Sequence, residues 1–257
     1  MAPLTLGLGI GPQYSKTLIP ASESQEYSLH LDGTNDRIQG GLGNSFVQDW
    51  GSNSSWTLKF SFKLDTIGSA QTLLTAGSPS NYIFISVQTD GKLFVQTLAS
   101  GAFTMNRGWT AGIDADTWYE VVITCDSSGT QRALVCYVNK VAKTLHTTNV
   151  STSSASLLPA SGKVTWGTFF NIVDFDFRID SIASWSSVLT SDEVTVLFDA
   201  GPDLTADQHG YVSSADLTSY YKIEEGSGTS LADSSGHSGT AALAIVNTAS
   251  WSTDTRL

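Results

Sequence analysis

The sequence contains very little cysteine. Its only two cysteines in 257 residues are Cys125 and Cys136, too few for the disulfide framework of a small secreted scaffold. We expect both to be buried free thiols, because unpaired cysteine is among the most buried residue types. The alternative is a disulfide between them, which requires a connection between their strands that is longer than the turn Asp126–Thr130.

Basic residues are also few. The 13 lysines and arginines are outnumbered by 24 acidic residues, which gives a formal net charge of −11. This balance argues against nucleic-acid or anionic-membrane partners, because phosphate groups are contacted mainly by Lys and Arg. No apolar run approaches the roughly 20 residues of a membrane helix, and the N-terminal residues lack the positive region of a signal peptide.

What the sequence has in abundance is the pattern of short β-strands separated by turns. Residues 56–64 place Trp, Leu and Phe at every second position, which predicts a half-buried strand. Residues 82–87 and 92–97 flank an Asp-Gly turn and predict a hairpin. A second hairpin is predicted from residues 118–124 and 133–138.

One helix interrupts this pattern. Thr190 and Glu193 have the spacing of a capping box, and Val194 and Leu197 then share one helical face. Gly201-Pro202 is a typical helix end. Many strands with one packed helix favour a sandwich of two antiparallel sheets.

Three segments resemble laminin-G-like jelly rolls of the concanavalin A-like lectin/glucanase superfamily. They are DTWYEVVIT at 116–124 with CYVNK at 136–140, FRIDSIASWSSVLTSDE at 177–193, and YYKIEEGSGTSLADSSG at 220–236. The resemblance implies an all-β, concanavalin A-like jelly-roll sandwich of two antiparallel sheets with one short helix. It also implies that Trp56, Trp118 and Trp185 occupy core positions.

The predicted organisation is an N-terminal arm over residues 1–21 and one laminin-G-like jelly-roll domain over 22–257. Residues 202–257 complete the sandwich. The arm carries alternating Leu4, Leu6, Leu8 and Ile10, which we expect to dock onto another chain.

Part of the chain is similar to modules encoded by tailed phages. The similarity lies in the segment 197–202, the polar stretch that ends at 213–216, the EEGSG run at 224–228 and the Leu-Gly-Leu-Gly start. It implies a non-enzymatic protein of the virion surface, a capsid decoration or a tail or fibre component that docks to other virion proteins, with homo-oligomerisation left open. The alternative is a glycan-binding, lectin-like module for host attachment, with a cell-surface glycan as partner.

Five residues are the candidates for ligand binding. They fall near predicted strand ends or loops, and two of them lie in the loop that corresponds to the family's ligand rim: Asn81, Tyr82, Trp109, Phe169 and Phe170. Exposed aromatic side chains at such places either stack on a sugar or pack against a partner chain. The sequence leaves both alternatives open.

Metal sites follow only from the resemblance. The positions that hold calcium in pentraxins fall here near Ser80-Asn81 and on 168–170, where the oxygen ligands that calcium needs are missing. Asp32 and Asp233 match acidic positions at loop starts and are the candidates for a structural calcium. We favour the alternative that each caps its own turn through backbone N–H groups, so no cofactor is predicted.

Catalytic residues are not predicted either. Asp174, Asp176 and Asp180 alternate with Arg178 along one strand, which invites comparison with the acidic strand of the superfamily's glucanases. That strand carries no Glu here, so we expect structural carboxylates paired with Arg178. The four histidines flank neither a Gly-x-Ser-x-Gly elbow nor an HExxH pair. We therefore expect a protein that is not an enzyme.

Overall fold

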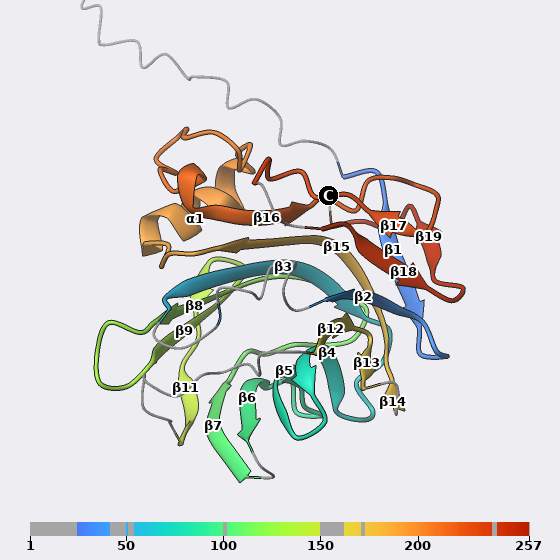
Figure 1. Cartoon of the computed structure of the whole chain (residues 1–257), viewed down its shortest axis with the longest axis horizontal. Helices are drawn as coiled ribbons and strands as arrows, with labels where there is room; N and C mark the ends of the chain where they lie inside the picture. The colour runs from blue at the N-terminus through green and yellow to red at the C-terminus, as the bar shows by residue number, and fades with distance from the viewer. Residues whose placement is uncertain are drawn as a thin grey trace, which may run out of the picture.

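The computed structural model describes residues 25–41, 50, 54–99, 102–149, 162–170, 173–237 and 241–256. Two antiparallel sheets pack face to face, and the helix α1 lies against the outside of one of them (Figure 1). This confirms the predicted fold class. The arm, with Leu4, Leu6, Leu8 and Ile10, lies outside the described residues. No described helix is long and apolar enough to cross a membrane.

The first sheet has eight strands. Its order is β10-β9-β8-β3-β15-β1-β19, and β16 also pairs with β15. The strands are β1 (Ser28–Asp32), β3 (Trp56–Leu64), β8 (Trp118–Asp126), β9 (Ala133–Val138), β10 (Val141–Ala142), β15 (Asp176–Trp185), β16 (Leu217–Tyr221) and β19 (Ser250–Ser252).

The second sheet has nine strands in the order β11-β7-β6-β5-β4-β12-β2-β18-β17. They are β2 (Arg37–Gly41), β4 (Gln71–Ser78), β5 (Asn81–Val87), β6 (Leu93–Ala99), β7 (Ala102–Trp109), β11 (Leu145–Asn149), β12 (Lys163–Trp166), β17 (Ser230–Leu231) and β18 (Leu243–Val246). The short strands β13 (Thr168–Phe169) and β14 (Val173–Asp174) form a separate pair.

The main core lies between the two sheets. Leu58, Phe60 and Phe62 of β3 are fully buried on its inner face, and the ring of Phe60 meets that of Trp166 from β12 at 5.2 Å between centroids. Because burying such a side chain stabilises a fold by about 1.5–3 kcal/mol, this layer supplies most of the hydrophobic stabilisation.

A second core covers part of the outer face of the eight-stranded sheet. There α1 (Ser191–Ala200) begins with the predicted capping box at Thr190 and Glu193 and ends at Gly201 in the left-handed conformation. Beyond it comes the short 3-10 helix η3 (Ser214–Asp216). The apolar residues of this layer are Val122, Ala183, Trp185, Leu189, Val194, Leu197, Leu204, Tyr211 and Leu217.

Both predicted hairpins are confirmed as β5–β6 and β8–β9. Cys125 and Cys136 are buried and free, as expected. Trp56 and Trp185 lie in the core, but Trp118 does not. It is only half-buried, and its indole N–H donates to Asp254 Oδ1 at 3.0 Å.

The prediction that three aspartates share one strand and pair with Arg178 is wrong. Asp174 belongs to β14, whereas Asp176 and Asp180 belong to β15. Arg178 does not pair with any of the three, because its guanidinium bonds Asp65 and lies 3.6 Å from Asp254 Oδ2. Alternation along the chain shows only which residues share a strand face. The partner of Arg178 is Asp65 at the end of β3, and it is a neighbour because β3 pairs with β15 in the sheet.

Candidate ligand-binding site

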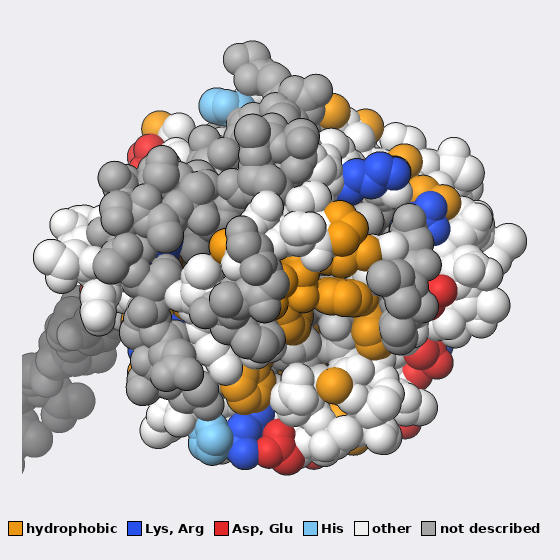
Figure 2. All heavy atoms as spheres, turned by 60° about the horizontal axis from the view of Figure 1, so that its bottom comes forward, with side chains coloured by type: hydrophobic (Ala, Val, Ile, Leu, Met, Phe, Trp, Pro, Cys, Tyr) orange, Lys and Arg blue, Asp and Glu red, His pale blue; other side chains and the backbone are white. Residues whose placement is uncertain are grey.

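Four aromatic side chains gather on the outer face of the nine-stranded sheet. Tyr82 and Phe84 come from β5, Phe169 ends β13, and Phe170 follows it; we call these four the aromatic cluster. All four are half-buried. Figure 2 shows apolar side chains collected near the middle of this face.

Strand alternation explains the first pair of rings. Along β5, Ile83 and Ile85 point into the core and are fully buried, so Tyr82 and Phe84 point outward. Tyr82 and Phe84 are therefore neighbours on one face, with their ring centroids 5.6 Å apart.

The second pair is delivered by a chain segment that crosses the sheet. Gly167 has φ +88° and donates its N–H to Leu73 O, and the hydroxyl of Thr75 donates to Thr168 O at 3.3 Å. These bonds to β4 fix residues 168–170 against the outer face of the sheet.

The rings of the cluster meet mainly edge to face. Tyr82 lies 5.4 Å from Phe169 and 5.1 Å from Phe170, and the latter two rings are 5.1 Å apart. Phe84 meets Phe169 at 6.0 Å. Such pairs contribute about 0.5–1.5 kcal/mol each beyond area burial, so the cluster is a preorganised apolar platform.

A cavity of about 270 Å³ adjoins the cluster at Phe170. Its wall combines apolar groups with two hydroxyl groups and an ammonium group; the lining residues are Gly77, Ser78, Pro79, Gly162, Lys163, Thr165 and Phe170. Phe170 itself has φ +50°, a strained conformation for a residue with a side chain. Strain of this kind is concentrated at ligand sites in proteins.

Polar groups at this face are able to form hydrogen bonds. Lys163 is exposed, and its Nζ lies 3.5 Å from Gln39 Oε1 of β2. Burial raises the pKa of the Tyr82 phenol above its ordinary value of 10.0. The phenol is therefore neutral at physiological pH and both donates and accepts hydrogen bonds.

Three of the five predicted ligand-binding residues, Tyr82, Phe169 and Phe170, come together here. Asn81 pairs with Ser78 across the β4–β5 hairpin next to Tyr82, but alternation along β5 directs it to the same side as Ile83, away from the cluster. Phe84 was missed, although its spacing of two residues from Tyr82 places it on the same strand face.

Trp109 does not belong to this surface. It is only 1 % exposed and lies in the core between the sheets. Met105 and Trp109 both point inward from β7, whereas Gly108 points outward beneath the ring of Phe94. The expectation that Trp109 offers its ring to a ligand is wrong for this reason.

The two calcium candidates each hold a turn. Asp32 Oδ1 accepts the N–H of Thr34 at 2.8 Å. Asp233 accepts the N–H of Tyr220 at 2.7 Å and, at the other oxygen, the hydroxyl of Ser235 at 2.6 Å. Both carboxylates thus accept hydrogen bonds from neighbouring backbone or hydroxyl groups. The prediction that no cofactor is bound, with calcium as the alternative that we do not favour, stays a prediction.

Comparison with known families identifies the class of protein. Residues 32–195 match the family described as the concanavalin A-like lectin/glucanases superfamily, and the chain belongs to that family. No curated protein matches the chain.

Solved structures share the fold at low sequence identity. A proposed carbohydrate binding protein from Bacteroides ovatus has a TM-score of 0.57 and 15% identity, and the match covers 88% of this chain and 60% of that one. A heptameric, SAP-like pentraxin from Limulus polyphemus has a TM-score of 0.49 and 11% identity, covering 86% and 95%. A structure described for the cell entry of botulinum neurotoxin type C through two ganglioside molecules has a TM-score of 0.50 and 12% identity, covering 68% and 42%. The chain thus spans 60% of the first and 42% of the third of these chains, less than two thirds of each.

Proposed function

We propose that this protein is a non-enzymatic carbohydrate-binding module that holds a glycan on the outer face of its nine-stranded sheet. The observation that carries the proposal is the aromatic cluster beside the cavity at Phe170. Tyr82 and Phe170 form the stacking surface, and Ser78, Lys163 and Thr165 supply polar contacts at its edge.

The chemistry of a sugar ring fits this surface. One face of a pyranose presents C–H groups, which pack on an aromatic ring, while its edge carries hydroxyl groups that need hydrogen-bond partners. Binding sites for small molecules are typically apolar concavities with a few placed polar groups. A cavity of about 270 Å³ lies close to the lower end of their usual size range, which suits one or two sugar residues.

The relatives are consistent with this proposal. The Bacteroides ovatus protein is described as a proposed carbohydrate binding protein, and the neurotoxin structure is described in terms of gangliosides, which are glycolipids. These descriptions belong to those proteins and support the proposal only as precedents for the fold.

Two of the three aspartates of the predicted acidic strand lie away from the aromatic cluster, which favours binding over hydrolysis. Asp176 and Asp180 lie in β15 of the eight-stranded sheet, whereas the aromatic cluster lies on the outer face of the other sheet. Asp180 is fully buried, and burial raises the pKa of its carboxyl above the ordinary value. Neither carboxyl group is therefore placed to act on a sugar held at the cluster.

The test is a glycan array on the purified full chain, followed by calorimetry with the strongest glycan. Tyr82→Ala and Phe170→Ala are expected to weaken binding at least tenfold, because each removes part of the stacking surface. Incubation of the same glycan with the protein should release no reducing ends.

Tyr137→Ala is the matched control. Tyr137 is also half-buried, and burial also raises the pKa of its phenol, but it lies in β9 of the other sheet. Its loss should leave the affinity unchanged. Failure of the array to find any glycan, or full affinity in the Tyr82 and Phe170 variants, would contradict the proposal.

A second candidate is the role at a virion surface, as a capsid decoration or a tail or fibre component. The observation that favours it is the resemblance of residues 197–202, 213–216 and 224–228 to phage modules. In this proposal Leu4, Leu6, Leu8 and Ile10 dock onto other virion proteins, and the glycan site faces outward. Deletion of residues 1–20 should abolish association with particles and leave glycan binding intact, and retained association would refute the docking role.

A further inference from the structure

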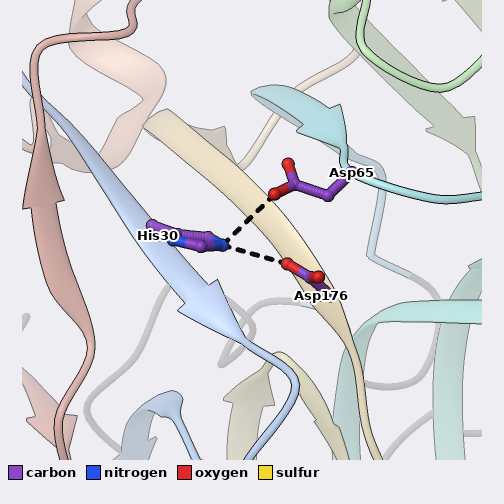
Figure 3. A group of neighbouring side chains, drawn as sticks. All are labelled: His30, Asp65 and Asp176. Carbon is purple, nitrogen blue, oxygen red and sulfur yellow. Dashed lines mark hydrogen bonds and ion pairs between the residues drawn. The ribbon is translucent and has the colours of Figure 1, made fainter.

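Three potential metal ligands converge on the outer face of the eight-stranded sheet, away from the aromatic cluster. They are His30 of β1, Asp65 directly after β3, and Asp176 at the start of β15 (Figure 3). His30 Nε2 lies 3.0 Å from Asp176 Oδ1 and 3.4 Å from Asp65 Oδ2. One ligand atom from each residue lies within 4.8 Å of the other two.

The fold dictates this convergence. Leu29 and Leu31 of β1 are fully buried, so His30 between them points to the outside of the sheet. Asp176 is placed there in the same way, since Phe177 is buried in the core. Asp65 is held at the end of β3 by its backbone N–H, which donates to Asp176 O at 3.4 Å.

We propose that His30, Asp65 and Asp176 bind a single first-row transition-metal dication of the Zn²⁺ class. With metal–ligand distances of about 2.1 Å, two ligand atoms of a tetrahedral zinc site lie about 3.4 Å apart. The two distances from His30 Nε2 are close to that value. An imidazole with two carboxylates suits zinc and its neighbours, whereas calcium takes six to eight oxygen ligands.

A second layer of contacts orients the carboxylate of Asp65. Arg178 Nη1 bonds Asp65 Oδ1, which leaves Oδ2 on the side of His30. Carboxylates that bind metals are commonly held by such outer hydrogen bonds. Arg178 is itself engaged with Asp254, because its Nε lies 3.6 Å from Asp254 Oδ2.

The local charge favours a dication. Asp32 is the cross-strand partner of Asp176, and like charges placed directly opposite each other destabilise a sheet. Lys63, which pairs with Asp254, is the other cation nearby. Within the part of the chain that the structure describes, Arg178 pairs with Asp65 and Asp254 and Lys63 pairs with Asp254, whereas no Lys or Arg pairs with Asp32 or Asp176.

The three ligands remain accessible from solvent. The side chains of His30 and Asp65 are 22% exposed, and that of Asp176 is 36% exposed. An ion can therefore enter without unfolding, and its fourth position is left to water. Because the ligands come from β1, the end of β3 and β15, the ion would tie β1 to the centre of the sheet.

The experiment is zinc calorimetry on the full chain without an affinity tag, after removal of metals with EDTA. We expect one Zn²⁺ per chain and no comparable binding of Ca²⁺ or Mg²⁺. At a hundredfold excess over the Kd, the Tm should rise by about 5–10 °C. Co²⁺ in place of Zn²⁺ should give the strong visible absorption of a four-coordinate ion.

Variants make the assignment specific. His30→Ala and the near-isosteric Asp176→Asn should each weaken Zn²⁺ binding by about tenfold or more. His237→Ala removes an exposed histidine elsewhere and should change nothing. The proposal is overturned if Zn²⁺ does not saturate a single site, or if folded His30→Ala and Asp176→Asn retain full affinity. Because the aromatic cluster lies on the other sheet, loss of glycan binding would leave this result untouched.

Discussion

Replacing Glu193 by Gln tests how the helix α1 is attached to the sheet. Glu193 is 3% exposed, and its carboxylate accepts four hydrogen bonds, from the N–H and hydroxyl of Thr190, the N–H of Val212 and the hydroxyl of Ser213. Gln has the same shape but keeps only one accepting oxygen, so two of the four donors lose their partner.

The magnitude follows from this count. A hydrogen bond to a charged group contributes about 1.5–3 kcal/mol, so the loss of two costs about 3 kcal/mol or more. The negative charge in the first turn of α1 adds about 0.3–1 kcal/mol through the helix dipole. The expected loss in the free energy of unfolding is about 3–7 kcal/mol, measured by urea unfolding at pH 7.

The pH dependence provides an independent check. Burial raises the pKa of Glu193, but the accepted hydrogen bonds outweigh it, and the net pKa lies below the ordinary value of 4.5. A carboxyl group with a lowered pKa in the folded state stabilises the fold above its unfolded pKa, and this contribution is lost as the pH falls through the folded pKa. The difference between Glu193→Gln and the original chain should therefore shrink below about pH 4.

The control is Asp192→Asn, which removes a neighbouring charge from the same helical turn. Asp192 is exposed, so only the dipole contribution of about 0.3–1 kcal/mol is at stake. The reasoning is refuted if Glu193→Gln costs no more than Asp192→Asn, or if its cost is the same at pH 3 and pH 7.

Three further predictions concern the core and the hairpin beside the candidate site. Burial raises the pKa of Cys125 to about 11 and that of Cys136 to about 12, so neither thiol should react with a thiol reagent at pH 8 until guanidinium unfolds the chain; rapid labelling of the folded chain would contradict this. Trp109→Ala should lower the free energy of unfolding, measured in urea, by about 3–5 kcal/mol, while the folded protein keeps its glycan affinity. A loss of affinity without a loss of stability would show instead that Trp109 contacts the glycan. Gly77 has φ +132°, and an added Cβ would collide with Asn81 O. Gly77→Ala should therefore lower the free energy of unfolding, measured in urea, by about 2–5 kcal/mol. The control is Gly68→Ala, where an added Cβ meets nothing within 4 Å and the loss should be far smaller.

Features with a local cause were predictable from the sequence. The capping box of α1 and the Asp-Gly turn before β6 depend on residues within a few positions of one another, so their pattern is complete in a short window. The inward and outward faces of β3 and β5 likewise follow from alternation alone.

Features that depend on the order of strands were not predictable. Arg178 meets Asp65 because β15 lies between β3 and β1, and the sequence gives no sign of that order. The same applies to His30, whose two acidic neighbours come from β15 and from the residue directly after β3. Phe169 and Phe170 of the aromatic cluster were predictable because the family resemblance places them in the loop of the ligand rim. The contact of Phe84 with Phe169 joins two strands that are distant in the sequence, so it follows only from the structure.

The two sheets differ in what their outer faces offer to a ligand. The outer face of the eight-stranded sheet is covered at one end by α1 and carries paired charges around His30 at β1 and β15. The outer face of the nine-stranded sheet carries apolar rings that are half-buried, and no helix among the described residues packs over them. A sugar stacks on an accessible ring and a dication binds converging side-chain ligands, so the two proposed sites lie on opposite sides of one core. Residues of either proposed site can therefore be substituted without directly removing a residue of the other.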